Sequence, residues 1–127
     1  MNNLYNEDYF ERGCSTGLSC YSNYRWIPEL TIPMCAEMIA HLNIDESKTV
    51  LDFGCAKGYS VKAFRLLYRN AYGVDISSYA TSSAPSEVLP YIHLINPGDD
   101  IPLINNTAYD WTIAKDVLEH VDYTDIK

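Results

Sequence analysis

The stretch from Val50 to Tyr59 constrains the fold of this chain more than any other part of its sequence. It reads V-L-D-F-G-C-A-K-G-Y, so two aliphatic residues lead into an acid and then into two glycines. The apolar residues after it recur at helical spacing: Val61, Ala63, Phe64, Leu67 and Tyr68. This pattern predicts a strand, a tight turn and a helix. Such a turn brings bare backbone N–H groups and a helix N-terminus against a ligand.

The spacing of the glycines separates two classes of cofactor. A dinucleotide-binding loop reads G-x-G-x-x-G/A after a strand. Counted from Gly54, Ala56 takes the second place and Tyr59 the last. Tyr59 is too large for the close contact between helix and strand that the last place requires. The stretch reads D-x-G-x-A-x-G instead, which disfavours a dinucleotide; an ordinary glycine turn in an α/β protein remains the alternative.

Length and composition exclude several classes of protein. A chain of 127 residues with 47% hydrophobic and 20% charged residues predicts one soluble globular domain. The formal net charge of −8 disfavours nucleic acid or an anionic membrane as the main partner, because like charges repel. No stretch is long and apolar enough to span a bilayer, and the polar, acidic N-terminus does not resemble a signal peptide. We therefore expect a cytoplasmic protein.

The four cysteines do not form a metal-binding pattern. Cys14, Cys20, Cys35 and Cys55 include no C-x-x-C pair and have no accompanying histidine cluster, so we expect no metal site. Without a secretion signal, reduced thiols are the default, and Cys35 and Cys55 are expected in the core.

The rest of the chain predicts alternating strands and helices. Residues 28–42 read as an amphipathic helix with Pro33 in its first turn and an apolar face of Cys35, Met38, Ile39 and Leu42. Strands are expected at 49–53, 71–74, 91–95 and 111–114. Helices are expected at 7–12 and 59–69, with a short one in 77–89. The first strand is nearly all apolar, as buried parallel strands are.

An acid stands at the end of the second predicted strand. Asp75 follows the glycine loop by roughly twenty residues, where a doubly wound sheet places a carboxylate that binds the ribose hydroxyls. The alternative is a solvated aspartate at a strand end.

Three motifs together resemble class I S-adenosylmethionine (SAM) dependent methyltransferases. They are the D-x-G-x-A-x-G loop, the G-V-D-I-S string around Asp75, and the run Y-D-W-T-I-A-K-D-V-L-E-H-V from Tyr109 to Val121. The resemblance implies an α/β, three-layer Rossmann-like sandwich with a mainly parallel sheet in the order 3-2-1-4. It also implies SAM as cofactor and S-adenosylhomocysteine (SAH) as product.

The resemblance also assigns roles to residues. The loop that holds the methionine end of SAM comprises Asp52, Phe53, Gly54, Cys55, Ala56 and Gly58. Asp75 would bind ribose and Ile76 would pack on adenine. Either Asp99 or Asp100 would meet the adenine amino group, and the spacing leaves the choice open. Lys115 and Asp116 would line the methyl-donor pocket. His120 is the candidate general base and Asp116 a second catalytic candidate, although His120 also suits a helix surface.

The N-terminal segment is rich in aromatic residues. Residues 1–27 read either as an aromatic cap packed on the domain or, as the resemblance implies, as a lid over the cofactor. The candidates for contact with the cofactor are Tyr24, Arg25 and Trp26. Arg25 could bind its carboxylate through two hydrogen bonds.

Members of that family normally continue beyond a fourth strand, whereas this chain stops at Lys127. We expect residues 1–127 to be a single domain, either a truncated product or a minimal SAM-binding half. Strand four then becomes an apolar sheet edge, which predicts self-association through that edge or cover by the N-terminal segment. The expected function is methyl transfer to an unidentified acceptor; the alternatives are a non-catalytic module for SAM or SAH and an NAD-binding domain.

Overall fold

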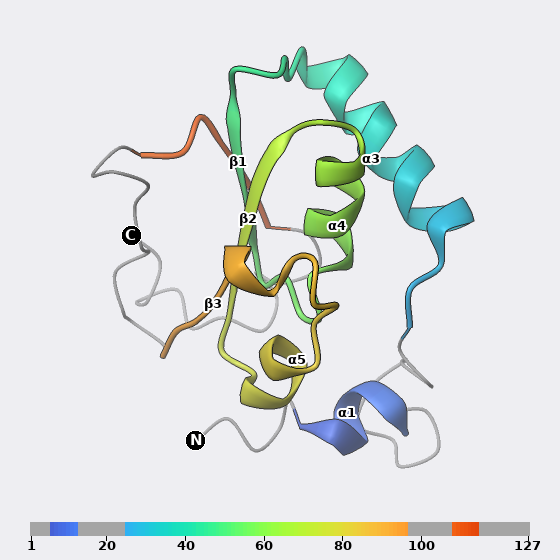
Figure 1. Ribbon diagram of the computed structural model, residues 1–127, viewed down its shortest axis with the longest axis vertical. Helices are drawn as coiled ribbons and strands as arrows, with labels where there is room; N and C mark the ends of the chain where they lie inside the picture. Colours follow the sequence, from blue (N-terminus) through green and yellow to red (C-terminus); the bar gives the residue numbers. More distant parts are fainter. Residues whose placement is uncertain (1–5, 13–24, 97–107, 115–127) are drawn as a thin grey trace.

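The described strands form one parallel sheet. The computed structural model describes residues 6–12, 25–96 and 108–114, and the strands are β1 (Thr49–Phe53), β2 (Asn70–Asp75), β3 (Ile92–Leu94) and β4 (Trp111–Ile113). Their order is β3-β2-β1-β4, and each neighbouring pair is parallel. The predicted fold class and strand order are confirmed (Figure 1).

The register brings the predicted acidic strand ends to one edge of the sheet. Asp52 of β1 pairs with Gly73 of β2 and, on its other side, with Ile113 of β4. Asp75 ends β2 and pairs with Leu94 of β3. Because the strands are parallel, their carboxyl ends face the same crevice, where ligands of open α/β sheets bind.

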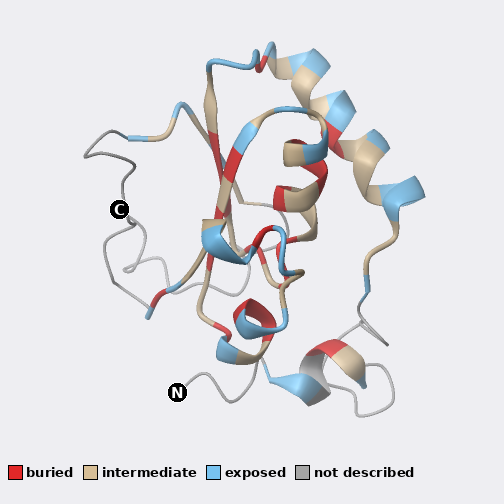
Figure 2. Cartoon of the chain, in the orientation of Figure 1, coloured by how far each residue is buried: buried red, intermediate tan, exposed pale blue. Residues whose placement is uncertain are grey.

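Helices cover one face of this sheet. Helices α4 (Tyr59–Leu66) and α5 (Ser78–Ser82) contact the sheet, and α3 (Pro28–Leu42) packs against α4. Helix α1 (Glu7–Glu11) packs against α5, and a 3₁₀ helix η2 (Leu89–Tyr91) precedes β3. Figure 1 shows α3 and α4 side by side next to β1 and β2, and these two helices contact each other. The core between helices and sheet contains Cys35, Val50, Val61, Phe64, Ala71 and Val88, all buried (Figure 2).

Helix α3 has the predicted bounds, whereas the predicted place of Pro33 within it is wrong. It starts at Pro28, so Pro33 lies inside the helix rather than in its first turn. Pro28 suits the first turn, because the N–H that it lacks has no partner within the helix there. The helix ends at Leu42, and the left-handed backbone of Asn43 (φ 53°) turns the chain so that the Ile44 N–H bonds the Ile39 carbonyl at 3.1 Å.

Helix α4 is shorter than predicted, and Tyr68 is not on its apolar face. The helix stops at Leu66, and Tyr68 takes a left-handed conformation (φ 62°) with its side chain 80% exposed. The left-handed residue turns the chain back toward β2, and the Arg69 N–H bonds the Phe64 carbonyl at 2.9 Å. The helical spacing thus extended past the point where the chain must reverse.

The opposite face of the sheet holds a second apolar cluster. Leu51, Val74 and Ile95 are buried there, and they pack against four half-buried side chains: Phe53, Tyr72, Ile76 and Tyr109. Both faces of β1 and β2 are therefore apolar, as expected for central parallel strands.

Arg65 of α4 joins the helix layer to the sheet. Its Nε donates to the Ala71 carbonyl at 2.8 Å, and its guanidinium lies 3.3 Å from the centre of the Tyr91 ring and 4.9 Å from that of Tyr72. The planar cation therefore stacks on aromatic rings near the start of β2.

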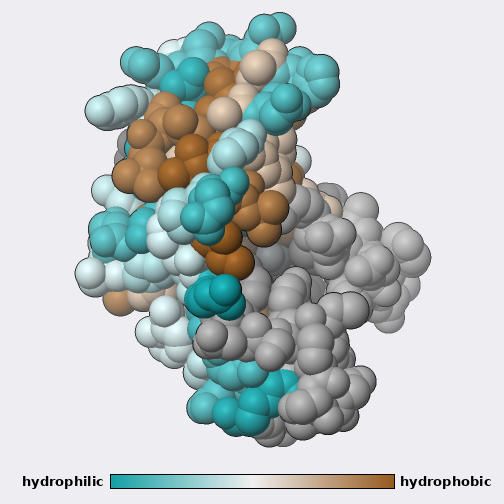
Figure 3. Space-filling model, turned by 90° about the vertical axis from the view of Figure 1, so that its right-hand side faces the viewer, coloured by the Kyte–Doolittle hydropathy of each residue, from teal (hydrophilic) through white to brown (hydrophobic). Residues whose placement is uncertain are grey.

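Apolar side chains also reach the surface. Figure 3 shows that the described part of the face on the right-hand side of Figure 1 carries apolar surface in its upper half, bordered by hydrophilic side chains. Large exposed apolar residues of the described chain are Leu30, Leu66, Tyr68, Leu89 and Leu94.

Candidate functional site

The predicted strand, turn and helix around the glycine loop are confirmed. β1 ends at Phe53 and α4 begins at Tyr59. Between them, Gly54 (φ 80°), Ala56 (φ 53°) and Gly58 (φ 78°) all take left-handed backbone conformations. Glycine adopts this conformation without steric cost, whereas Ala56 does so under strain.

Backbone N–H groups of this loop bond to the protein itself. Gly54 and Cys55 both donate to the Val74 carbonyl, at 2.8 and 3.0 Å, and Gly58 donates to the Cys55 carbonyl at 2.8 Å. The N–H of Ala56 donates to Oδ2 of Asp75 at 2.7 Å. The expectation of bare N–H groups is therefore wrong at these four positions. Buried backbone donors need partners, and the end of β2 supplies three of these four bonds.

Asp75 is the acid that organises this end of the sheet. Its Oδ2 accepts from Ala56, and its Oδ1 accepts from the Ser77 N–H at 2.9 Å. Burial raises the pKa of Asp75, and the backbone hydrogen bonds from Ser77, Ala56 and Ile76 offset only part of that rise. Since each carboxylate oxygen has two lone pairs, the group can still accept bonds from hydroxyl donors.

Asp52 lies close to Asp75, on the same side of the molecule. Asp52 lies at the carboxyl end of β1 and is 5% exposed. Burial raises the pKa of the Cys55 thiol well above its usual value, and the negative charges of Asp52 and Asp75 add to the rise. The pairing of Asp52 with Gly73 of β2, and the bond from the Ala56 N–H to Asp75, place the two predicted anchors beside the same loop.

Two small residues make this arrangement possible, and the sequence analysis missed one of them. A Cβ on Gly73 would lie 2.7 Å from both Cβ and Sγ of Cys55, so only glycine lets the loop settle on β2. A glycine inside an otherwise apolar strand was the signal. A Cβ on Gly58 would collide with Cδ1 of Ile92, so protein packing demands a glycine there, independently of any ligand.

A charged contact between the loop and α1 was also missed. Lys57, between Ala56 and Gly58, forms an ion pair with Glu11. The Tyr79 hydroxyl of α5 donates to the same carboxylate at 2.7 Å. Neither partner gives a sequence signal, because they are 46 residues apart.

The N-terminal candidates are only partly described. Trp26 packs 5.9 Å from the Tyr59 ring at the start of α4, with Nζ of Lys62 lying 4.6 Å from the centre of its ring. Arg25 is exposed. Phe53 and Ile76 are half-buried beside the second apolar cluster. The remaining predicted site residues lie outside the described residues: Tyr24, Asp99, Asp100, Lys115, Asp116 and His120.

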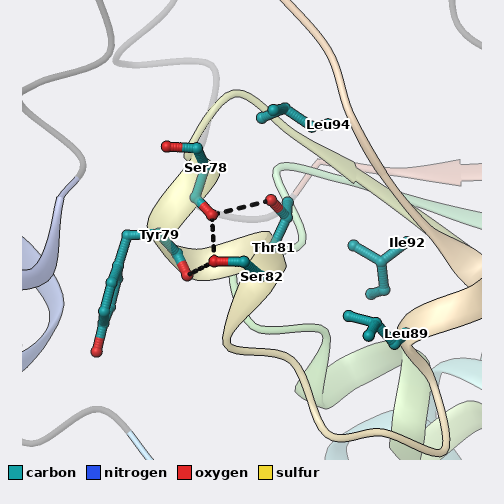
Figure 4. Close-up of a pocket in the computed structure, with 7 residues that line it drawn as sticks. All are labelled: Ser78, Tyr79, Thr81, Ser82, Leu89, Ile92 and Leu94. Atoms are coloured by element: carbon teal, nitrogen blue, oxygen red, sulfur yellow. Dashed lines mark hydrogen bonds between the residues drawn. The ribbon is translucent and has the colours of Figure 1, made fainter.

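A shallow pocket of about 480 Å³ lies between α5 and β3 (Figure 4). Its apolar side is formed by Leu89, Ile92 and Leu94. On the α5 side, the hydroxyls of Thr81 and Ser82 bond to helix carbonyls. The lining includes none of the predicted site residues, so we assign the candidate site to the acidic strand ends rather than to this pocket.

The described ranges contain neither a metal-binding cluster nor a membrane-spanning helix. Within residues 6–12, 25–96 and 108–114, no three His, Cys, Asp or Glu side chains come together as they would around a metal ion. In the same ranges no helix has both the length and the apolar character needed to cross a membrane.

Three solved structures are similar to this chain, and the first of them shares its fold. A glycopeptide N-methyltransferase, MtfA, complexed with sinefungin is 12% identical with a TM-score of 0.57, covering 75% of this chain and 40% of its own. YjhP from E. coli is 21% identical with a TM-score of 0.48, covering 69% and 38%. The MccD protein is 24% identical with a TM-score of 0.44, covering 54% and 33%. The chain thus spans well under half of the solved structures it resembles.

The sequence comparisons decide the family. No curated protein sequence matches this chain. A family model described as a methyltransferase domain matches residues 31–125, which include the glycine loop, Asp75 and β4. This chain therefore belongs to the methyltransferase domain family.

Proposed function

We propose that this chain binds SAM and takes part in SAM-dependent methyl transfer. Its family and its fold support methylation in general. The observation that carries the assignment of the cofactor is the pair of carboxylates, buried Asp52 and half-buried Asp75, around a glycine loop at the carboxyl ends of β1 and β2. Paired acceptors there match the donor groups of a nucleoside joined to an amino acid.

The hydrogen bonds that the backbone N–H groups of the loop already make favour SAM over a dinucleotide. A pyrophosphate is held by backbone N–H groups that point at it. In this chain the N–H groups of Gly54, Cys55, Ala56 and Gly58 are already bonded to the protein. A ligand without phosphate does not need them. It needs acceptors for its ribose hydroxyls and its amino group, which Asp75 and Asp52 supply.

The proposed division of roles follows from position. Asp75 binds the ribose hydroxyls with the lone pairs left by Ala56 and Ser77, and Asp52 binds the amino group. Gly54 and Ala56 bring the loop close to the methionine end. SAM supplies a methyl carbon already activated by its sulfonium, so the protein contributes positioning and exclusion of water.

The residues outside the described ranges keep their proposed roles. Asp99 or Asp100 would meet adenine, and Lys115 and Asp116 would line the donor pocket. Tyr24 would lie beside the sulfonium and His120 would act as base. Trp26, which lies within the described ranges, keeps its proposed place beside the sulfonium as well.

Calorimetric titration tests the cofactor. The protein is titrated with SAM, SAH and NAD⁺, and Asp75→Asn, which keeps the shape but removes the charge, serves as the matched variant. We expect SAM and SAH to bind and NAD⁺ not to. Asp75→Asn should weaken SAH about 10- to 100-fold, because a bond to a charged group contributes about 1.5–3 kcal/mol. Equal affinity of both proteins for SAH, or preference for NAD⁺, would refute the assignment.

A non-catalytic SAM- or SAH-binding module is the second candidate. The match covers 40% of MtfA, so most of that longer protein has no counterpart in this chain. Transfer of a labelled methyl group to candidate small molecules, sugars and proteins separates the two functions. Binding of SAM without transfer to any acceptor would favour the module.

We also propose that β4 associates with another strand. Trp111 and Ile113 pack into the core beside β1, while Thr112 is exposed. Among the described strands only β1 pairs with β4. Strand edges with unpaired backbone groups pair readily with other strands, and a second copy of this chain would pair with the edge of β4. Light scattering after size exclusion should give a dimer that Thr112→Lys weakens; a monomer at all concentrations contradicts it.

A further inference from the structure

The glycine loop is joined to the N-terminal helix by a partly buried polar cluster. The Glu11 carboxylate of α1 accepts from Nζ of Lys57 and, at 2.7 Å, from the Tyr79 hydroxyl. The side chains of Lys57 and Glu11 are 9% and 18% exposed. We call Glu11, Lys57 and Tyr79 the α1 clasp.

Apolar contact supports the same clasp. Phe10, next to Glu11, is 3% exposed, and its ring stacks on that of Tyr79 with centres 6.2 Å apart. Nζ of Lys57 lies 5.5 Å from the centre of the Tyr79 ring. Figure 4 shows the Tyr79 ring projecting away from Leu89 and Ile92, toward α1. One helix turn therefore reaches both α5 and the loop.

Lys57 stands where the loop is most constrained. It lies between two left-handed residues, Ala56 at φ 53° and Gly58 at φ 78°. An alanine in that conformation is strained, so surrounding contacts must hold it in place. Asp75 holds the Ala56 N–H on one side, and Glu11 holds the Lys57 side chain on the other.

The charges make the clasp sensitive to the loss of one partner. A lysine buried without its carboxylate carries an uncompensated charge, which a folded protein avoids by moving the group to water. Burial opposes ionisation of Glu11, but the hydrogen bonds from Lys57 and Tyr79 outweigh it and hold the pKa of Glu11 below its usual value. Loss of Glu11 should therefore pull Lys57, and with it the loop, out of position.

We propose that Glu11 is a positioning residue for the glycine loop, so that docking of α1 and ligand affinity at the loop are coupled. The ligand part of this inference rests on the proposed function. Coupling of this kind is reciprocal: a ligand that orders the loop must stabilise α1 docking by the same factor.

Hydrogen exchange and calorimetry on the full chain test the coupling. The variants are Glu11→Gln, Lys57→Met and their double, with Glu7→Gln as the matched control. Glu7 is also on α1, but its ion pair with Arg12 (3.3 Å) is exposed. Amides of 54–58 report the loop, amides of 10–12 report α1, and amides of β1 report global opening.

We expect Glu11→Gln to speed exchange in α1 and the loop about ten-fold or more while β1 stays unchanged, and Glu7→Gln to change it less than about two-fold. SAH should bind about ten-fold more weakly to Glu11→Gln, with Glu7→Gln as wild type. The double variant should lose no more exchange protection and SAH affinity than the worse of the two single variants, because both substitutions break the same ion pair. Saturating SAH should slow α1 exchange in the wild type.

Two results would overturn the proposal. One is equal behaviour of Glu11→Gln and Glu7→Gln in both exchange and SAH affinity. The other is fully additive effects of Glu11→Gln and Lys57→Met, which would mean that they act independently. If the loop responds to Glu11→Gln but the wild type binds no SAH, the link between α1 and the loop holds while the proposed ligand is wrong.

Discussion

Replacing Gly58 by alanine separates what the fold needs from what a ligand needs. The Gly58 backbone is left-handed at φ 78°, and a Cβ built on it would collide with Cδ1 of Ile92 and lie 3.6 Å from Val88. Both costs arise in the free protein. Gly58→Ala should therefore destabilise the fold whether or not a ligand is present.

The structure sets the size of the effect. An alanine in left-handed conformation costs about 1–2 kcal/mol, and the reduced freedom of the unfolded chain returns about 0.4–1 kcal/mol. The collision adds roughly 1 kcal/mol, the low end for overpacking, because the atom struck is the end of a flexible side chain. The free energy of unfolding should fall by about 1–3 kcal/mol, which for a chain of this length lowers Tm by roughly 5–10 °C.

Two further variants separate the cost of the collision with Ile92 from the cost of the left-handed conformation. The double variant Gly58→Ala with Ile92→Val lacks the methyl group that the new Cβ would strike. It should therefore regain the stability lost to the collision but keep the cost of the left-handed conformation. Ala56→Gly is the reverse substitution, from alanine to glycine, at another left-handed residue of the same loop. It relieves strain at φ 53° but loosens the unfolded chain, so its stability should stay within about 0.5 kcal/mol of the wild type.

Urea unfolding followed by circular dichroism measures all four proteins. Wild-type stability of Gly58→Ala would refute the reasoning, since it would mean that neither the backbone conformation nor Ile92 constrains this position. Complete rescue by Ile92→Val would show that the collision alone matters and that the left-handed conformation costs nothing.

Three other groups give measurable effects. Burial raises the pKa of Asp75, and hydroxyl donors prefer the carboxylate, so SAH affinity should weaken as the pH falls through that raised pKa; calorimetry in buffers of different ionisation enthalpy should detect the proton released on binding. Arg65→Met loses the Ala71 hydrogen bond and the stacked cation on Tyr91, and should cost about 1–2 kcal/mol in urea unfolding; an unchanged midpoint would contradict it. Burial, and then the hydrogen bond to Glu11, raise the pKa of Tyr79 from 10.0 to about 12. The stabilisation that the protonated Tyr79 hydroxyl gives to the docking of α1 is therefore complete below pH 10 and is lost between pH 10 and about 12. Exchange of α1 amides should accelerate in that window, and Tyr79→Phe should abolish the step.

Local patterns in the sequence predicted the parts of the fold that depend on neighbouring residues. The aliphatic run of β1, the glycines after it and the apolar spacing of α4 each lie within one short segment. The parallel order followed from the strands alternating with helices. The limits of α3 were also predicted, although Pro33 lies inside that helix rather than in its first turn. The end of α4 was less accurate, since the left-handed conformation of Tyr68 reverses the chain just after the helix.

The contacts between distant segments could not be predicted in the same way. The sequence placed Asp52 and Asp75 at strand ends, and the parallel register brings them together. It gave no reason to join Glu11 to Lys57, because an ion pair between remote residues has no spacing rule. Nor did it show that the loop's N–H groups bond to β2, which requires Gly73 to leave room for Cys55.

Nuclear magnetic resonance of the ¹⁵N-labelled chain during titration with SAH tests the central claim most directly. We predict saturable shifts of the amides of Gly54–Gly58 and of Ser77, the backbone groups around Asp52 and Asp75, and no such shifts with NAD⁺. Shifts confined to the pocket between α5 and β3, or none at all, would contradict the assignment of a SAM site to the acidic strand ends.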